Sequence, residues 1–278
     1  MDAEVYYFSG TGNSLFAAKE IAEKISGKLV SIPSVIDEEH IRTEAGVLGI
    51  VFPVYYAVND SGIPLIVSRF VRKLESINSK HIFAVCTCGY MPGATIENMA
   101  KLLKFQGGEL AAGFILKMSN GALSLEKQQK TLNDQKEKLN GVCEYIRVRK
   151  KGKLETRGIL RKIVLSPLLY LAIKPAFSRR YRKLSGSPRL PFSDLIPIAD
   201  RSFRVDSKCI GCGICAQVCP VNNITMVSGK PQWQHHCETC YACYTWCPQA
   251  AIGGDIVSYN KRYHHSTVKL PEMLGAKK

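Results

Sequence analysis

The most informative stretch of the sequence is Ala3-Glu4-Val5-Tyr6-Tyr7-Phe8-Ser9-Gly10-Thr11-Gly12-Asn13-Ser14-Leu15-Phe16. Residues 3–8 have the apolar and aromatic composition of a β-strand. Glycines and hydroxyl residues follow, and apolar residues then recur on one helical face as far as Ile25. The stretch therefore predicts a strand, a tight loop and a helix.

The same alternation continues along the first half of the chain. Further strands are predicted at residues 29–32, 47–52, 82–87 and 113–117, with helices at 63–75, 94–106 and 124–147. Near-continuous apolar strands that alternate with helices are typical of a parallel sheet covered on both faces. The sequence therefore predicts an α/β fold with a doubly wound parallel sheet in residues 1–146.

The loop Ser9–Ser14 has a composition suited to a phosphate group. Backbone N–H groups, hydroxyls and a helix dipole can converge on a phosphate without any lysine. The loop lacks the Gly-Lys-Ser/Thr of the Walker pattern and the third glycine of the dinucleotide pattern. After the first strand of a doubly wound sheet it lies at a topological switch point, where ligands bind. The alternative interpretation is an ordinary glycine-rich turn.

Ser9, Thr11, Gly12 and Ser14 match the [S/T]-x-T-G-x-[S/T] phosphate loop of flavodoxins, and residues 1–146 resemble that family. The resemblance implies a five-stranded sheet of order 2-1-3-4-5. It also implies that this loop, Asn13 included, holds the phosphate of FMN.

Flavodoxins hold the isoalloxazine ring with the loops after the third and fourth strands, so the resemblance extends to two further segments. The candidate ring-binding residues are Pro53, Tyr55, Tyr56, Thr87, Cys88, Gly89 and Tyr90. An aromatic side chain in each loop suits stacking on a planar ring. The alternative is that Tyr55 or Tyr56 only caps the edge of the sheet.

The C-terminal region carries a cysteine motif that occurs twice. The first copy is Cys209-x2-Cys212-x2-Cys215-x3-Cys219-Pro220, and 28 residues later comes Cys237-x2-Cys240-x2-Cys243-x3-Cys247-Pro248. Three thiolates at this spacing bind three irons of a cubane, and the cysteine before proline ligates the other cluster. The predicted ligands are therefore Cys209, Cys212, Cys215 and Cys247 for one [4Fe-4S] cluster, and Cys237, Cys240, Cys243 and Cys219 for the second. Zinc sites use paired C-x2-C units and would not require two such triplets.

Residues 203–255 resemble bacterial two-cluster ferredoxins, and the two resemblances together point to the single-chain flavodoxin/ferredoxin fusions known as ferrodoxins. They imply FMN and two [4Fe-4S] clusters as cofactors. A flavin holds one or two electrons and a cubane passes one, so we predict an electron-transfer protein that relays electrons between FMN and the clusters. The alternative is an FMN-dependent reductase of a small molecule, with Tyr90, Cys88 or Asn120 as proton donor.

Basic residues are concentrated between the two domains. The chain has 38 Lys and Arg against 23 Asp and Glu, net +15, and residues 147–190 alone hold 14 basic and 1 acidic residues, net +13. The predicted division is a flavodoxin-like domain at 1–146, a connector at 147–202, a ferredoxin-like domain at 203–255 and a tail at 256–278.

Three roles are open for this connector. It packs against both domains and fixes their separation, with Pro167 kinking or splitting any helix; or it lies on an anionic membrane; or it docks an acidic redox protein. No nucleic acid partner is expected, because no aromatic-interleaved recognition module accompanies the charge.

Composition and cysteine usage indicate an intracellular protein. With 46% hydrophobic and 22% charged residues, the chain can fill sizeable cores. The N-terminus lacks the features of a secretory signal, and no apolar run approaches the roughly 18 residues of a membrane-spanning helix. Clustered cysteines favour metal binding in a reducing compartment, so we predict a cytoplasmic location. His264 and His265 are expected in a solvated tail.

Overall fold

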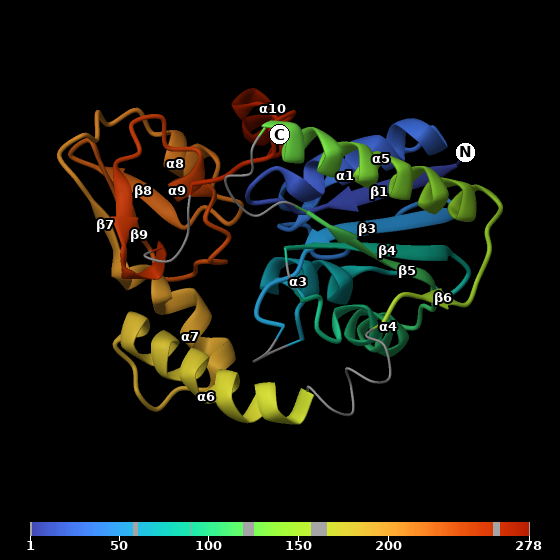
Figure 1. The fold of residues 1–278 in the computed structure, drawn as a ribbon, viewed down its shortest axis with the longest axis horizontal. Coiled ribbons are helices and arrows are strands. Elements are labelled where there is room, and N and C mark those ends of the chain that lie inside the picture. Colours follow the sequence, from blue (N-terminus) through green and yellow to red (C-terminus); the bar gives the residue numbers. More distant parts are fainter. Residues whose placement is uncertain are drawn as a thin grey trace.

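The computed structural model describes residues 2–57, 61–89, 91–118, 125–156, 166–257 and 262–277. The chain forms an α/β domain, two connecting helices and a smaller C-terminal domain, and its last residues return to the α/β domain (Figure 1). These parts are named the N-terminal domain (2–156), the connector helices (166–198), the C-terminal domain (199–257) and the tail (262–277).

The N-terminal domain is built on one parallel sheet with the strand order β2-β1-β3-β4-β5-β6. Its strands are β1 (Ala3–Tyr7), β2 (Lys28–Ser31), β3 (Val47–Pro53), β4 (His81–Cys88), β5 (Leu110–Lys117) and β6 (Lys153–Leu154). The two central strands, β3 and β4, are buried along almost their whole length, which explains their continuous apolar sequence. The predicted fold class and the order 2-1-3-4-5 are confirmed.

The strand β6 extends the sheet beyond the predicted strands. It comes from the segment predicted as connector and pairs in parallel with β5 at Ala112 and Gly113. Next to it, the Ile115 N–H donates to Glu155 Oε2 at 2.8 Å. Two exposed residues carry no hydrophobic pattern, so the sequence could not indicate this strand.

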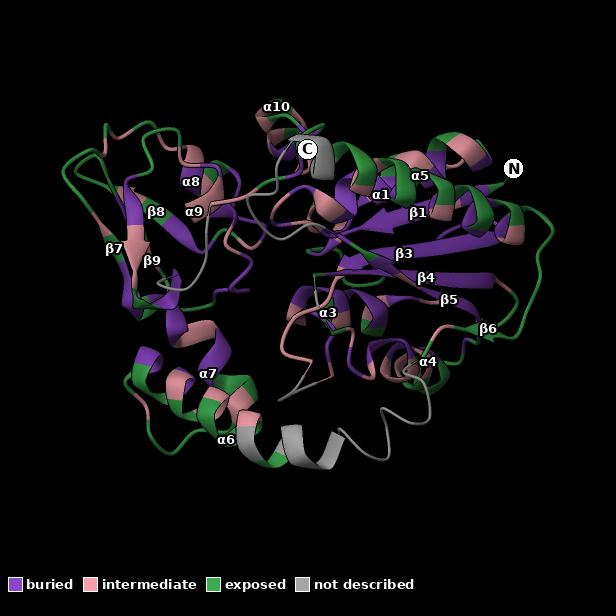
Figure 2. Cartoon of the chain, in the orientation of Figure 1, coloured by how far each residue is buried: buried purple, intermediate pink, exposed green. Residues whose placement is uncertain are grey.

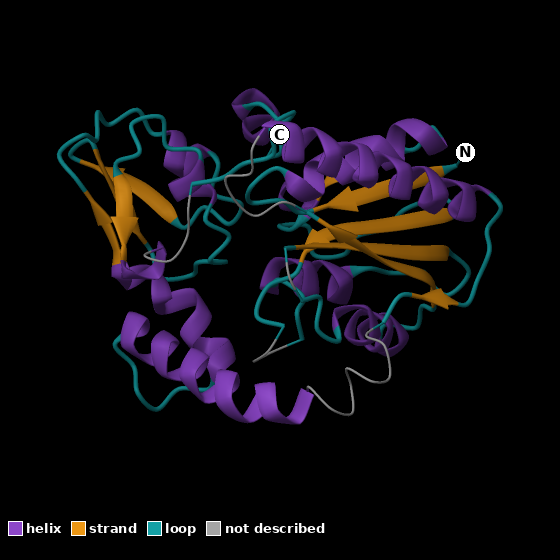
Figure 3. Ribbon diagram, in the orientation of Figure 1, coloured by secondary structure: helices purple, strands orange, loops and turns teal. Residues whose placement is uncertain are grey.

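Helices cover both faces of the sheet (Figure 3). On one face α1 (Asn13–Ile25) packs beside α5 (Leu125–Arg147). On the other face α3 (Leu65–Lys73) packs beside α4 (Thr95–Phe105). The single turn α2 (Ile32–Val35) follows the edge strand β2 and contacts α3.

The C-terminal domain repeats its secondary structure as it repeats its cysteine motif. Its two antiparallel pairs are β7 (Phe203–Val205) with β10 (Ile252–Gly254), and β8 (Ile224–Val227) with β9 (Lys230–Trp233). A short helix carries the third cysteine of each triplet, namely α8 (Ile214–Gln217) and α9 (Ala242–Thr245). Single 3-10 turns, η2 (Ala199–Ser202) and η3 (Asp255–Val257), begin and end the domain.

The connector helices are α6 (Ser166–Ser185) and α7 (Phe192–Ile198), which pack on each other. Pro167 was expected to kink or split a helix, but within the described residues it lies in the first turn of α6, which continues from it to Ser185. A proline fits there, since the first N–H groups of a helix have no intrahelical partner. Pro175 lies inside the helix instead.

The tail crosses back to the N-terminal domain and ends in α10 (Leu270–Gly275). The expectation of a solvated tail is wrong for His265, which is 4% exposed and stacks on Phe16 of α1 with ring centroids 4.1 Å apart. A polar and histidine-rich sequence gave no indication that this segment is held against another domain.

The apolar interior crosses the boundaries between the parts. Buried residues fill the sheet and its helices (Figure 2), and the larger core continues into Trp246 of the C-terminal domain and Val268 of the tail. Tyr56 and Leu65 of the N-terminal domain pack against the smaller core. Among the described residues, none of the helices combines the length and apolar character that a membrane crossing requires.

Candidate functional site

The loop Ser9–Ser14 lies between the carboxyl end of β1 and the first turn of α1. Gly12 adopts the left-handed conformation with φ +89°, which favours glycine, and its N–H donates to Ser9 Oγ at 3.0 Å. The Ser14 and Thr87 hydroxyls form a buried hydrogen bond of 2.8 Å, which joins the loop to the end of β4. The structure thus brings together the predicted residues of the first and fourth strands.

The two tyrosines after β3 lie at the boundary of the domains rather than at an outer edge. The Tyr55 ring meets Phe8 edge-on, with centroids 6.2 Å apart. Tyr56 has φ +54°, packs against Tyr181 and Phe192 of the connector helices, and donates its hydroxyl to the Glu238 carbonyl at 3.2 Å. Burial raises the pKa of both tyrosines well above the ordinary value, so both hydroxyls stay protonated.

The other candidate ring-binding residues lie at the carboxyl ends of β3 and β4. Pro53 ends β3, and Thr87 and Cys88 end β4. Cys88 is 7% exposed and burial raises the pKa of its thiol, whereas Gly89 is exposed. Tyr90, like Asn120, lies outside the described residues.

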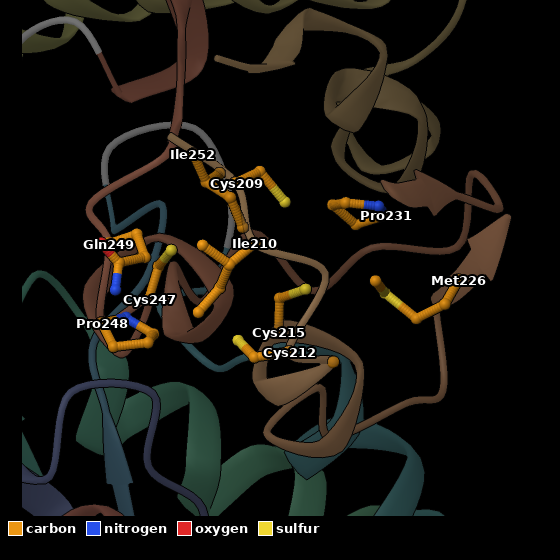
Figure 4. A pocket seen from close by; sticks show the side chains of 11 residues that line it. Cys209, Ile210, Cys212, Cys215, Met226, Pro231, Cys247, Pro248, Gln249 and Ile252 are labelled. Atoms are coloured by element: carbon orange, nitrogen blue, oxygen red, sulfur yellow. The ribbon is translucent and has the colours of Figure 1, made fainter. Parts of the chain in front are cut away.

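Two cavities in the C-terminal domain are each lined by four of the predicted ligand cysteines. The outer cavity is lined by Cys209, Cys212, Cys215 and Cys247 (Figure 4). The inner cavity is lined by Cys219, Cys237, Cys240 and Cys243. Each cavity thus takes three cysteines from one motif copy and its fourth from the other copy. The thiols are free, and no three His, Cys or acidic side chains of the described residues converge as a single-ion site.

Backbone N–H groups point at the sulfur atoms around these cavities. Asn223 N–H donates to Cys219 Sγ at 3.2 Å and Thr239 N–H donates to Cys237 Sγ at 3.2 Å. Burial raises the pKa of the Cys215 thiol to about 11 and that of Cys240 to about 12. Without a bound cation, these two side chains are therefore protonated thiols at neutral pH. Coordination to a cation stabilises the deprotonated thiolate form.

Comparison with known proteins assigns the cysteine-rich part. Residues 202–259 match the family described as 4Fe-4S dicluster domain. Together with the strand order of the sheet, this decides the architecture. The chain joins a domain with the flavodoxin-like strand order to a region that matches the 4Fe-4S dicluster family, and these two parts are called the flavodoxin-like domain and the dicluster domain below. None of the curated proteins compared with the chain matches it.

Solved structures resemble the flavodoxin-like half only weakly. A flavodoxin from the domain Archaea is 18% identical, covers 52% of this chain and 99% of its own, and has a TM-score of 0.37. A flavodoxin from Streptococcus pneumonia TIGR4 is 17% identical, with coverages of 50% and 98% and a TM-score of 0.33. Rubredoxin oxygen:oxidoreductase from Desulfovibrio gigas is 15% identical, with coverages of 51% and 37% and a TM-score of 0.33.

The dicluster domain touches the flavodoxin-like domain at the loop Ser9–Ser14. A Cβ built on Gly10 would lie 2.2 Å from the carbonyl oxygen of Cys240, so only glycine fits here. The Trp246 indole N–H donates to the Gly10 carbonyl at 3.0 Å. The inner cavity therefore lies directly beside the predicted phosphate loop.

A buried carboxylate forms a second attachment between the two domains. Glu238, 2% exposed, accepts hydrogen bonds from the Ile66 N–H at 2.9 Å and from Arg69 Nη2 at 2.8 Å. Burial raises the pKa of this carboxyl, and Arg69 and the Ile66 N–H act in the opposite direction. Removal of Arg69 would leave a buried carboxylate without its ionic partner.

The tail forms a third attachment. Arg262 donates to carbonyl oxygens of the dicluster domain, among them that of Ala250 at 2.7 Å. His264 stacks on Trp246 with centroids 4.5 Å apart, and the His265 N–H donates to the Thr11 carbonyl at 2.9 Å. Burial, followed by the neighbouring His264, lowers the pKa of His265 to about 4. The tail therefore contacts both the predicted phosphate loop and the dicluster domain.

The residues that make these contacts were missed in the sequence, although the internal repeat contains a signal for two of them. Glu238 and Trp246 occupy the positions of Ile210 and Val218 in the first motif copy. A charged residue and a large aromatic residue, each present in only one of two copies, could have marked that copy as the one that contacts another domain.

Proposed function

We propose that this chain is an electron-transfer protein that relays electrons between FMN in the flavodoxin-like domain and two [4Fe-4S] clusters in the dicluster domain. The observation that carries the proposal is the direct contact of the predicted phosphate loop with the inner cavity, where Gly10 meets the Cys240 carbonyl. When bound, FMN supplies one- or two-electron chemistry and each cluster supplies one-electron chemistry.

The residues of the loop fit a terminal phosphate. Ser9 and Thr11 offer hydroxyl groups, and the backbone turns at Gly12 into the N-terminus of α1, a helix of 13 residues whose dipole favours an anion. Asn13 and Ser14 form the first turn of that helix. Because these groups suit a single terminal phosphate, we propose FMN as the flavin.

The two cavities fit two cubane clusters. In each, four thiols surround a space inside a domain that matches a dicluster family. Neighbouring N–H groups point at sulfurs of both cavities, among them the Ala251 N–H at Cys247 Sγ of the outer one. We assign Cys209, Cys212, Cys215 and Cys247 as ligands of one cluster, and Cys219, Cys237, Cys240 and Cys243 as ligands of the second. Hydrogen bonds to sulfur and limited solvent access are the means by which a protein sets the cluster potential.

Anaerobic purification tests the proposal through composition. We expect eight irons, eight sulfides and one FMN per chain, with two cluster signals in an EPR redox titration. Zinc in place of iron, or a preparation that cannot bind flavin, would contradict it. Flavin reoxidation that requires a small-molecule substrate and bypasses any protein acceptor would favour the reductase instead.

We also propose a cytoplasmic location and an acidic redox partner. Clustered thiols that must stay reduced until they bind iron are compatible with the cytoplasm. The excess of basic residues is compatible with an acidic redox partner, and co-sedimentation with anionic lipid vesicles tests the competing role of a membrane contact.

A further inference from the structure

We propose that the chain exchanges electrons with other proteins at the outer cavity, through a docking surface formed by Lys208, Ile210 and Lys230 that fits an acidic patch on a redox protein. This inference rests on the proposed function. It adds the place of exchange, the order of the two cavities and the chemistry of the partner.

The burial of the cysteines separates the two cavities. All four cysteines of the inner cavity are buried, with exposures between 7% and 9%, and the flavodoxin-like domain contacts this region at Gly10. In the outer cavity Cys212 is exposed, and Cys209 and Cys247 are partly exposed. The inner cavity therefore faces the flavodoxin-like domain, and the outer cavity is the one within reach of another protein.

The internal repeat identifies the corresponding contact positions. Glu238 follows the first cysteine of its motif copy, and it is buried against Ile66 and Arg69 of α3. Ile210 follows the first cysteine of the other copy and is 67% exposed. The same position beside each cavity thus carries a contact residue, covered by this chain in one case and free for a partner in the other.

The surface around Ile210 combines an apolar centre with basic neighbours. Lys230 donates to the Cys209 carbonyl at 2.9 Å, and Lys208, which directly precedes Cys209 in the sequence, is exposed. Gly211 packs against Gly229, which brings the cysteine loop next to the β8–β9 turn, where Val227 is 44% exposed. An exposed apolar group within a polar rim is typical of a protein-binding surface.

The positive charge around the outer cavity indicates which kind of protein can bind there. Residues 201–231 contain four basic residues and a single acidic residue, Asp206, and all five side chains are exposed. The Asp206 carboxylate accepts the Lys208 N–H at 2.8 Å. Complementary charge speeds encounter and fixes orientation, so this surface favours an acidic partner.

The test compares charge reversals at three places on the full chain loaded with its cofactors. The docking variant is Lys208→Glu/Lys230→Glu, and Ile210→Glu tests the apolar centre. Lys101→Glu/Lys104→Glu and Phe105→Glu on α4 are matched controls, because these residues are exposed and the net charge changes by the same amount. Arg179→Glu/Lys183→Glu tests the connector helix α6. The probe is an acidic plant-type [2Fe-2S] ferredoxin.

Two quantities are measured, the dissociation constant of the oxidised proteins by calorimetry and the second-order rate of electron exchange. We expect the docking variant and Ile210→Glu to weaken binding and slow exchange roughly tenfold at low salt, with a smaller effect at high salt. Both α4 controls should stay within about twofold of the parent. The iron content per chain and the internal flavin-to-cluster rate should not change.

Equal effects at α4 and at the docking surface would overturn the inference, as would a larger effect on α6 or a complex that is insensitive to every variant. In each of these cases the proposed function would stand, provided that internal transfer is intact. If the parent chain instead lacks flavin or iron, the proposed function fails first, and this inference fails with it.

Discussion

Gly10→Ala should separate the flavodoxin-like domain from the dicluster domain at the contact that carries the proposed function. The new Cβ would lie 2.2 Å from the carbonyl oxygen of Cys240 and 3.0 Å from the Tyr55 hydroxyl. The nearest atom belongs to the backbone, in a segment whose Cys240 and Cys243 line the inner cavity. No rotation of a side chain can relieve the overlap, so the two chain segments must move apart.

The magnitude follows from two contributions. Overpacking of a close contact costs about 1–3 kcal/mol. The shift also lengthens the 3.0 Å hydrogen bond from Trp246 to the Gly10 carbonyl, which contributes about 1 kcal/mol. We therefore expect the free energy of unfolding to fall by about 2–4 kcal/mol, and internal electron transfer to slow.

The assay is anaerobic urea unfolding followed by far-UV circular dichroism, together with flavin content after gel filtration and the internal transfer rate. Gly141→Ala is the matched control, because this glycine lies in α5 and a Cβ there meets nothing within 4 Å. Alanine should leave stability unchanged or raise it by up to about 1 kcal/mol. A Gly10→Ala protein with parental stability, full flavin and unchanged internal transfer would refute the reasoning.

Three further changes test the cofactor sites and the tail. Cys219→Ala should destroy the cluster of the inner cavity and spare the outer one, whereas Cys143→Ala in α5 should keep all eight irons; unchanged EPR spectra in the first variant would contradict the crossed ligation. Thr11→Leu removes a hydroxyl and crowds the phosphate loop, so flavin should be lost while the clusters persist, and FAD in the parent extract would contradict the assignment of FMN. Since the pKa of His265 is lowered from 6.5 to about 4, the unfolded chain binds more protons between these values and stability falls as the pH falls through this window. His265→Gln should flatten that part of the stability profile, and an identical profile for parent and variant would show that the histidine does not titrate there.

Local patterns in the sequence were sufficient for much of this protein. Apolar strands that alternate with helices predicted the parallel sheet, because a parallel sheet with both faces covered needs that pattern. The order of β1 to β5 was implied by the resemblance of the first loop to the flavodoxin phosphate loop, and the structure has that order. The fixed spacing of the two cysteine triplets likewise predicted two groups of four thiols, and the structure places those groups around two cavities. In both cases the signal is a periodic pattern or a fixed spacing that repeats along the sequence.

Contacts between distant segments could be seen only in the tertiary structure. Trp246 reaches Gly10, Glu238 reaches Ile66, and His265 packs on Phe16, across sequence separations that no local pattern records. The strand β6 was also decided by its pairing with β5 rather than by its own composition. Which cavity faces inward and which faces solvent depends on the same long-range packing, because the two motif copies are equivalent until a second domain covers one of them.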